Sequence, residues 1–182
     1  MSRIIDTQSF LRHFYKEPNR LFHVREMARL LKLNPTTASK YLNQLNKEGL
    51  LAKSSELGHL LFKANTESSS YRYAKIYYNL KSLWDSGLIV YLDKELHYPE
   101  AILLFGSYAK GENDENSDID LFVLANTKKH LDFDIFEKKL RANIQLFVKN
   151  RDEFAKLQKE NKNLVNSILN GIVIKGYLEV FK

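Results

Sequence analysis

Apolar residues in the first third of the chain recur at helical spacing in two stretches that a short polar break separates. The first stretch covers residues 24–31, and the second places three apolar residues on one helix face: Ala38, Leu42 and Leu45. Asn34 is a suitable N-cap for the second helix, and Pro35 suits its first position, where no backbone N–H is needed. Gly49 is expected to end that helix. The pattern predicts a helix, a short turn and a second helix.

A hairpin is predicted after these helices, in the segment LLAKSSELGHLLFKA at residues 50–64. Its centre, residues 54–59, contains the turn-forming pair Ser-Ser and Gly58. Two helices followed by a hairpin form the outline of a winged helix-turn-helix, which we assign to residues 1–65.

An aromatic-rich segment at residues 71–87 follows a polar break at residues 66–70, and we expect it to form a helix. Two roles are open for its tyrosines: stacking on nucleic-acid bases, or packing between domains. Packing is favoured because the tyrosines are interspersed with aliphatic residues. We therefore treat residues 66–86 as an aromatic linker helix.

Strand and helix patterns alternate from residue 87 onward. Strands are predicted at residues 101–105, running into a Gly-Ser turn, and at 118–125, 143–150 and 172–178. Helices are predicted at 88–96, at 133–141 and, as one long helix closed by Gly171, at 151–171. This order predicts a small mixed sheet flanked by helices over residues 87–182. The fold class of the whole chain is therefore α+β, with a winged helix-turn-helix followed by a small mixed-sheet α/β domain.

Composition adds few constraints, whereas the distribution of charge adds one. The chain has 182 residues and no cysteine, which excludes disulfides and fits a reducing compartment. No apolar run approaches the roughly 18 residues of a membrane span, so we expect a cytoplasmic protein without membrane contact. Residues 1–65 hold 11 lysines and arginines against 5 acidic residues, while the remainder is balanced. A basic segment of this kind is typical of a nucleic-acid-binding module.

The N-terminal segment resembles the winged-helix DNA-binding domains of bacterial and archaeal regulators, chiefly through NPTTASKYLNQLNKEGLL and the hairpin after it. In such domains the second helix enters the major groove of double-stranded DNA. The residues that fall on its polar side, and would face DNA, are Thr36, Thr37, Ser39, Lys40 and Asn43. Further contacts from the wing would come from Lys53, His59 and Lys63. The alternative is an ordinary solvated helix in a domain used for dimerisation or protein contact.

Two carboxylates, Asp118 and Asp120, lie within a strand-like segment and therefore project from one face. Like charges at that spacing repel, so a bound cation is the expected partner. Gly106 and Ser107 follow the preceding strand, where a glycine lets the backbone approach a phosphate closely and a serine offers a hydroxyl and an N–H. The alternative is an ordinary turn beside a polar strand face.

The run Phe105-Gly106-Ser107, ten residues, then Asp118-Ile119-Asp120-Leu121 resembles the signature of the nucleotidyltransferase superfamily that includes DNA polymerase beta. The resemblance covers about residues 95–180 and is nearest to the minimal nucleotidyltransferases. It implies that Asp118 and Asp120 are catalytic and hold Mg²⁺, and that ATP is the nucleoside triphosphate substrate. It also implies that Gly106, Ser107 and the basic Lys110 bind the triphosphate.

The chain departs from that pattern in the later strand that usually supplies a third carboxylate. The segment ANIQLFVKN offers Asn143 and Gln145 on one face and no acidic residue. A neutral amide is a poor substitute for an ionised ligand, so the metal that would activate the attacking oxygen loses a ligand.

Two functions follow from these observations. The first is Mg²⁺-dependent transfer of a nucleoside monophosphate, most simply from ATP, to a hydroxyl on a protein; the resemblance implies an antitoxin that modifies a small helical toxin. The second is a transcriptional regulator whose inactive nucleotidyltransferase fold senses nucleotide or serves as an interaction surface. The sequence leaves a homodimer open in either case.

Overall fold

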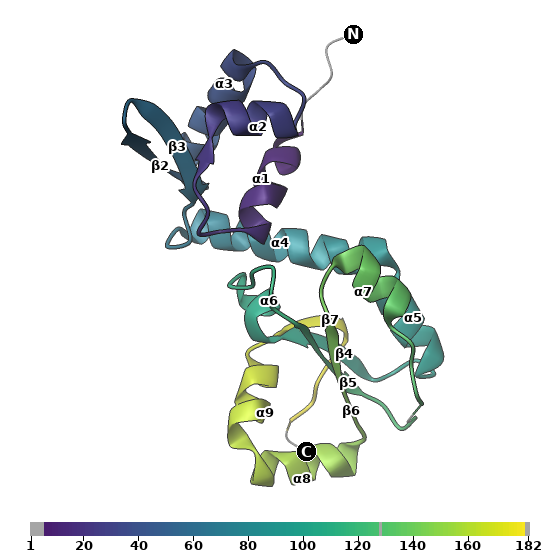
Figure 1. Cartoon of the computed structure of the whole chain (residues 1–182). Coiled ribbons are helices and arrows are strands. Elements are labelled where there is room, and N and C mark those ends of the chain that lie inside the picture. Colours follow the sequence, from purple (N-terminus) through teal and green to yellow (C-terminus); the bar gives the residue numbers. More distant parts are fainter. Residues whose placement is uncertain (1–5, 128, 181–182) are drawn as a thin grey trace. The chain divides into compact units, whose positions relative to one another are not determined.

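The computed structural model describes residues 6–127 and 129–180 and divides the chain into two compact units (Figure 1). The N-terminal unit spans Met1–Lys75 and the C-terminal unit spans Ile76–Lys182. The division falls inside one helix, α4 (Ser69–Ser86), which contributes residues to both units.

Helices and a small antiparallel sheet make up the N-terminal unit. Its elements before α4 are α1 (Thr7–Lys16), β1 (Phe22–His23), α2 (Val24–Leu30), α3 (Pro35–Lys47), β2 (Leu51–Glu56) and β3 (His59–Ala64). The strands pair in the order β1-β3-β2, and both pairings are antiparallel. The two helices and the hairpin predicted for residues 24–64 are thus present.

Local sequence explains where α3 begins and ends. The Asn34 side chain accepts a hydrogen bond from the backbone N–H of Thr37 (2.7 Å), and Pro35 occupies the first turn, as predicted. Gly49, just beyond the helix, has a φ of +76°, a conformation that glycine adopts without strain. The three predicted core residues, Ala38, Leu42 and Leu45, are fully buried.

Two features of this unit differ from the sequence-based expectations. The first helix, α1, was not predicted, although Phe10, Leu11, Phe14 and Tyr15 bury one of its faces. The hairpin turn lies at Leu57 and Gly58, both with positive φ, rather than across residues 54–59. Such a two-residue turn matches the twist of the flanking strands, so Ser54 and Ser55 remain paired within β2.

A mixed four-stranded sheet lies at the centre of the C-terminal unit, as predicted. After α4 the elements are α5 (Leu88–Glu95), β4 (Ala101–Phe105), α6 (Gly106–Lys110), β5 (Ile119–Leu124), α7 (Asp134–Leu140), β6 (Ile144–Lys149), α8 (Arg151–Glu160), α9 (Lys162–Leu169) and β7 (Ile172–Gly176). The strand order is β6-β5-β4-β7; β5 and β6 are parallel, and β4 is antiparallel to both of its neighbours.

Helices cover both faces of this sheet (Figure 1). Alternate residues of β4 and β5 point to opposite faces, so one set packs with α5 and α7 and the other with α8 and α9. Leu104 and Leu121 belong to the first layer, whereas Phe105 and Phe122 belong to the second. Because both faces are covered, the two central strands are almost continuously apolar, and their polar residues are confined to strand ends.

The single long helix predicted for residues 151–171 is wrong, because the chain breaks at Asn161. This residue has φ −139° and ψ 76°, outside the helical region. Its backbone N–H donates to the Leu157 carbonyl and closes α8, while its side chain accepts from the Leu164 N–H (3.0 Å) and starts α9. The bend lets both helices follow the same face of the sheet, where Phe154, Val165 and Ile168 are buried.

Replacing Asn161 with alanine should destabilise the C-terminal unit by about 1 kcal/mol, because α9 loses the side chain that caps its first turn. Urea unfolding followed by circular dichroism measures the change. Asn163→Ala, at an exposed position of α9, is the matched control and should leave stability almost unchanged. An Asn161→Ala variant as stable as the control would show that the cap does not contribute.

Candidate functional site

The antiparallel pairing of β4 with β5 brings the Gly-Ser turn and the two aspartates together. In this register Phe105, the last residue of β4, lies opposite Asp120. The next residue, Gly106, has a φ of +70°, and a Cβ at that position would collide with the Asp120 carboxylate. Glycine is therefore favoured for two independent reasons: the positive φ, and the proximity of the Asp120 carboxylate, which any larger residue would displace.

The predicted Gly-Ser turn is a short helix, α6, that begins directly at Gly106. Ser107 lies in its first turn, and Lys110 is exposed at its end. A residue that the sequence analysis missed, Asn79 of α4, holds this segment in place. The buried amide of Asn79 donates to the Tyr108 carbonyl and to the Asn113 side chain, both at 2.9 Å.

Asp118 directly precedes β5 rather than lying inside it, and it is bracketed by two amides from the neighbouring strand region. Asn143 Nδ2 donates to Asp118 Oδ1 (3.0 Å), and Gln145 Nε2 donates to Asp118 Oδ2 (2.6 Å). The parallel register of β5 and β6 places Gln145 opposite Asp120. Asn143 and Gln145, which stand where a third acidic residue was expected, thus donate hydrogen bonds to Asp118, one of the two predicted metal ligands.

The environment of Asp120 disfavours its charged form. Burial raises the pKa of the Asp120 carboxyl above its usual value, and the negative charge of Asp118 raises that pKa further. Divalent cations bind the ionised carboxylate, so a bound cation would reverse this effect.

The donor set fits one divalent cation. Two carboxylates beside a glycine turn leave the remaining positions of a Mg²⁺ ion to water and phosphate oxygens. Within the described ranges, 6–127 and 129–180, no group of three or more His, Cys, Asp or Glu side chains could hold a metal ion. Nearby acidic residues have other roles: Glu137 accepts from the Ile144 N–H, and Asp132 accepts from the Asp134 N–H.

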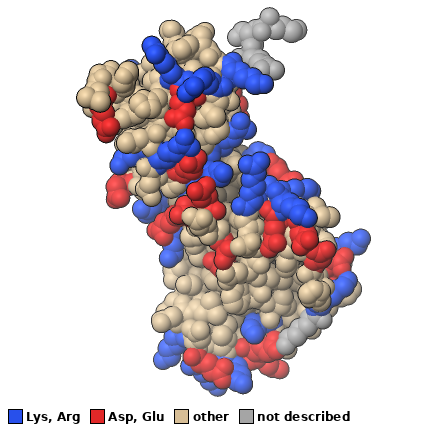
Figure 2. Space-filling view, in the orientation of Figure 1, with Lys and Arg blue, Asp and Glu red and all other residues tan. Residues whose placement is uncertain are grey.

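Basic side chains are spread over the N-terminal unit. Within residues 6–75 lysines and arginines outnumber the acidic residues, and Figure 2 shows both signs mixed over the C-terminal unit. No helix among the described residues is long and apolar enough to cross a membrane.

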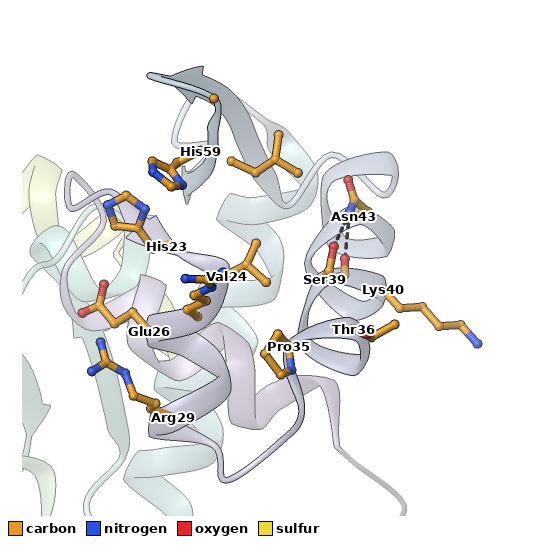
Figure 3. A pocket seen from close by; sticks show the side chains of 13 residues that line it. His23, Val24, Glu26, Arg29, Pro35, Thr36, Ser39, Lys40, Asn43 and His59 are labelled. Carbon is orange, nitrogen blue, oxygen red and sulfur yellow. Dashed lines mark hydrogen bonds between the residues drawn. The ribbon is translucent and has the colours of Figure 1, made fainter.

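An open groove of about 830 Å³ lies between α2, α3 and the hairpin (Figure 3). Four of the five residues predicted to face DNA line it, namely Thr36, Ser39, Lys40 and Asn43, and so do Arg25, Arg29, His23 and His59. Thr37 does not line the groove, and its backbone N–H is used by the Asn34 cap. Figure 3 shows Lys40 extending away from α3 into open space.

Asn43 connects α3 to the hairpin instead of standing free on the helix. Its Nδ2 donates to the Ser39 carbonyl (2.8 Å), and its Oδ1 accepts from Lys53 Nζ of β2 (2.9 Å). At the hairpin end of the groove the His59 ring contacts the His23 ring, with centroids 5.9 Å apart. Lys53 and Lys63, the other predicted wing residues, lie outside the groove lining.

Comparison with known proteins identifies one match. Residues 87–177 match the family model described as Polymerase beta, Nucleotidyltransferase. No match was found among curated proteins or among solved structures.

Asp120→Asn should stabilise the metal-free protein at neutral pH, by less than about 1 kcal/mol because the site is partly solvated. A raised pKa means that the folded state holds the Asp120 proton more tightly than the unfolded state does. Folding stability therefore falls as the pH rises above the usual range of an aspartate. Thermal unfolding in EDTA across pH should show the gain at neutral pH and lose it below about pH 4.

The control is Asp152→Asn, an exposed carboxylate in the first turn of α8, whose removal should give no gain. If the gain in stability of Asp120→Asn persisted unchanged at low pH, the gain would not come from removing the Asp120 charge.

Proposed function

We propose, because the chain belongs to the polymerase beta nucleotidyltransferase family, that its C-terminal unit binds a nucleoside triphosphate, most simply ATP, as the Mg²⁺ complex. The observation that carries this proposal is the register of β4 and β5, which sets Gly106 directly against Asp120. A backbone without a side chain beside a carboxylate leaves room for a phosphate to approach a cation held there.

Each residue has a separate task in this proposal. Asp118 and Asp120 would hold the Mg²⁺ ion, which would neutralise charge on the triphosphate. The Ser107 hydroxyl and the N–H groups of the Gly106 turn would donate to phosphate oxygens. The exposed ammonium of Lys110 would add a positive charge beside the triphosphate.

We propose that the N-terminal unit is a winged helix-turn-helix that binds double-stranded DNA. Three features support it: the order α2, α3, hairpin; the groove lined by Lys40 with Arg25 and Arg29; and the excess of basic residues. Asn43 would position the hairpin against α3, because both ends of its amide are already bonded. Thr36, Ser39 and Lys40 would make the contacts along α3. DNA binding and the absence of cysteine fit a cytoplasmic protein, and a homodimer fits the pairing of two DNA half-sites.

Family membership favours transfer of the nucleotide as the reaction. An acceptor hydroxyl on a protein, such as a toxin partner, would attack the α-phosphorus of ATP. The new O–P bond forms as the bond to pyrophosphate breaks, and the hydroxyl proton passes to solvent. Products are the adenylylated protein and pyrophosphate.

A second candidate is favoured by the two amides on Asp118. A regulator that binds Mg·ATP without transferring it needs the glycine turn and the two carboxylates but no third one. In that function the bound nucleotide would regulate DNA binding.

Replacing both aspartates by asparagine should abolish Mg²⁺-dependent ATP binding, because the charge that recruits the cation is removed. Calorimetric titration of ATP into the full chain with Mg²⁺ should show at least about a tenfold weaker affinity for the Asp118→Asn, Asp120→Asn protein. Asp152→Asn is the control for loss of one surface charge and should bind as the wild type. Equal affinity in all three proteins would overturn the nucleotide site.

Labelled ATP separates the two uses of the nucleotide. Incubation with Mg²⁺ and a lysate of the source organism should place label from α-labelled ATP, and none from γ-labelled ATP, on a protein if transfer occurs. Tight Mg·ATP binding with no protein-bound label would leave the sensor as the function.

Salt-sensitive binding of duplex DNA is expected from the N-terminal unit, because phosphate contacts release counterions. Fluorescence anisotropy with the full chain should give log affinity falling linearly with log salt. Lys40→Ala should weaken binding and reduce the steepness of that slope by about 1. Lys47→Ala, exposed on α3 outside the groove, is the matched control. No binding to any duplex at low salt would make the unit a protein-interaction module.

A further inference from the structure

We infer that Asn143 and Gln145 restrict the nucleotide site to a single divalent cation, the one that accompanies the triphosphate. The inference rests on the proposed binding of Mg·ATP and adds the number of ions and the residues that set it. Its basis is the contact of both amides with Asp118.

The two amides use lone pairs that a second cation would need. Each carboxylate oxygen of Asp118 has about two acceptor positions, and one on each oxygen is taken by an N–H. What remains on Asp118, together with Asp120, is enough for one ion. A second ion bridged by the same carboxylate would displace a hydrogen bond of 2.6 Å from Gln145.

Charge leads to the same result. The two carboxylates carry two negative charges, which one divalent cation neutralises, and the triphosphate brings its own. Gln145 stands opposite Asp120 on β6 and turns its N–H group, not its oxygen, toward Asp118. A second cation would therefore meet a neutral hydrogen-bond donor where it needs an anionic ligand.

Glu137, the acidic residue that contacts the start of β6, does not take over that role. Its carboxylate accepts a backbone hydrogen bond from Ile144, and no cluster of three metal-binding side chains forms within residues 6–127 and 129–180. The acceptor oxygen therefore has no cation to lower its pKa, and transfer by the natural chain is slow relative to nucleotide binding.

Gln145→Glu provides the direct test, because it places a carboxylate at the same point of β6. Gln145 is exposed, so the substitution leaves the core intact. Mn²⁺ is titrated into the full chain in the presence of a non-hydrolysable ATP analogue, and free Mn²⁺ is counted by electron paramagnetic resonance. Wild type should bind one Mn²⁺ per nucleotide, and Gln145→Glu should bind two. The paramagnetic resonance spectrum of the bound ions in Gln145→Glu should show magnetic coupling between two neighbouring Mn²⁺ ions.

Two variants separate the new ligand from a general effect of charge or side-chain loss. Gln145→Ala removes one amide without adding a carboxylate; because Asn143 still occupies Asp118 Oδ1 and no third anionic ligand is present, this variant should still bind one ion. Asn163→Asp adds a negative charge on the exposed face of α9, away from the β6 position, and should also bind one. Gln145→Asp is the alternative acidic variant should Gln145→Glu prove unstable.

Thermal unfolding supplies a readout that does not depend on nucleotide transfer. A third carboxylate beside Asp118 and Asp120 should lower the melting temperature of Gln145→Glu in EDTA, because the three charges repel one another. Adding Mn²⁺ should then raise the melting temperature of Gln145→Glu by more than it raises that of the wild type. Transfer of label from α-labelled ATP should rise at least about tenfold in Gln145→Glu.

The outcomes separate this inference from the function on which it rests. Two ions in the wild type, or one in both Gln145→Glu and Gln145→Asp, would overturn the one-ion site while leaving nucleotide binding intact. Wild-type protein that binds neither the analogue nor nucleotide-dependent Mn²⁺ would overturn the proposed function, and the inference with it.

Discussion

The pairing of β4 with β5 is the constraint on which the C-terminal unit depends. One antiparallel register buries alternate side chains on two faces of the sheet and, at its end, sets Gly106 against Asp120. A shift by one residue would turn the buried Leu104 and Leu121 to the opposite layer, so the hydrophobic core itself fixes the register. The site therefore needs no flexible loop to assemble, because strand packing has already placed the glycine and the carboxylate together.

Asp118 and Asp120 lie two residues apart, yet their surroundings differ. Burial and the charge of its neighbour raise the pKa of the Asp120 carboxyl, while Asp118 accepts a hydrogen bond from each of two neutral amides. In the proposed site a cation would therefore meet one carboxylate already oriented by hydrogen bonds, and would favour ionisation of the other. This difference comes from Asn143, which directly precedes β6, and from Gln145 within that strand.

Much of this could be predicted from the sequence, because its causes are local. The cap at Asn34, the apolar face of α3 and the nearly unbroken apolar strands β4 and β5 are all encoded within a few residues. The same reasoning could have found α1, whose apolar residues recur at helical spacing. The bend at Asn161 was missed because apolar periodicity continues across it, although the Asn161 side chain caps the first turn of α9.

The contacts of Gln145 could not be predicted for a different reason. They depend on the parallel pairing of β5 with β6, strands that α7 separates along the chain. Sequence showed the absence of a third carboxylate, but not that the amides in its place would bind Asp118.

The helix α4 belongs to the cores of both units. In the N-terminal unit the buried Tyr71 hydroxyl donates to the Phe14 carbonyl (3.0 Å), and in the C-terminal unit Asn79 supports the segment after Gly106. Seven residues lie between the two positions on a single helix. A recombination point in this helix would therefore leave both cores complete only between Lys75 and Asn79, because a break before Tyr71 or after Asn79 would hand a buried residue of one unit to the other.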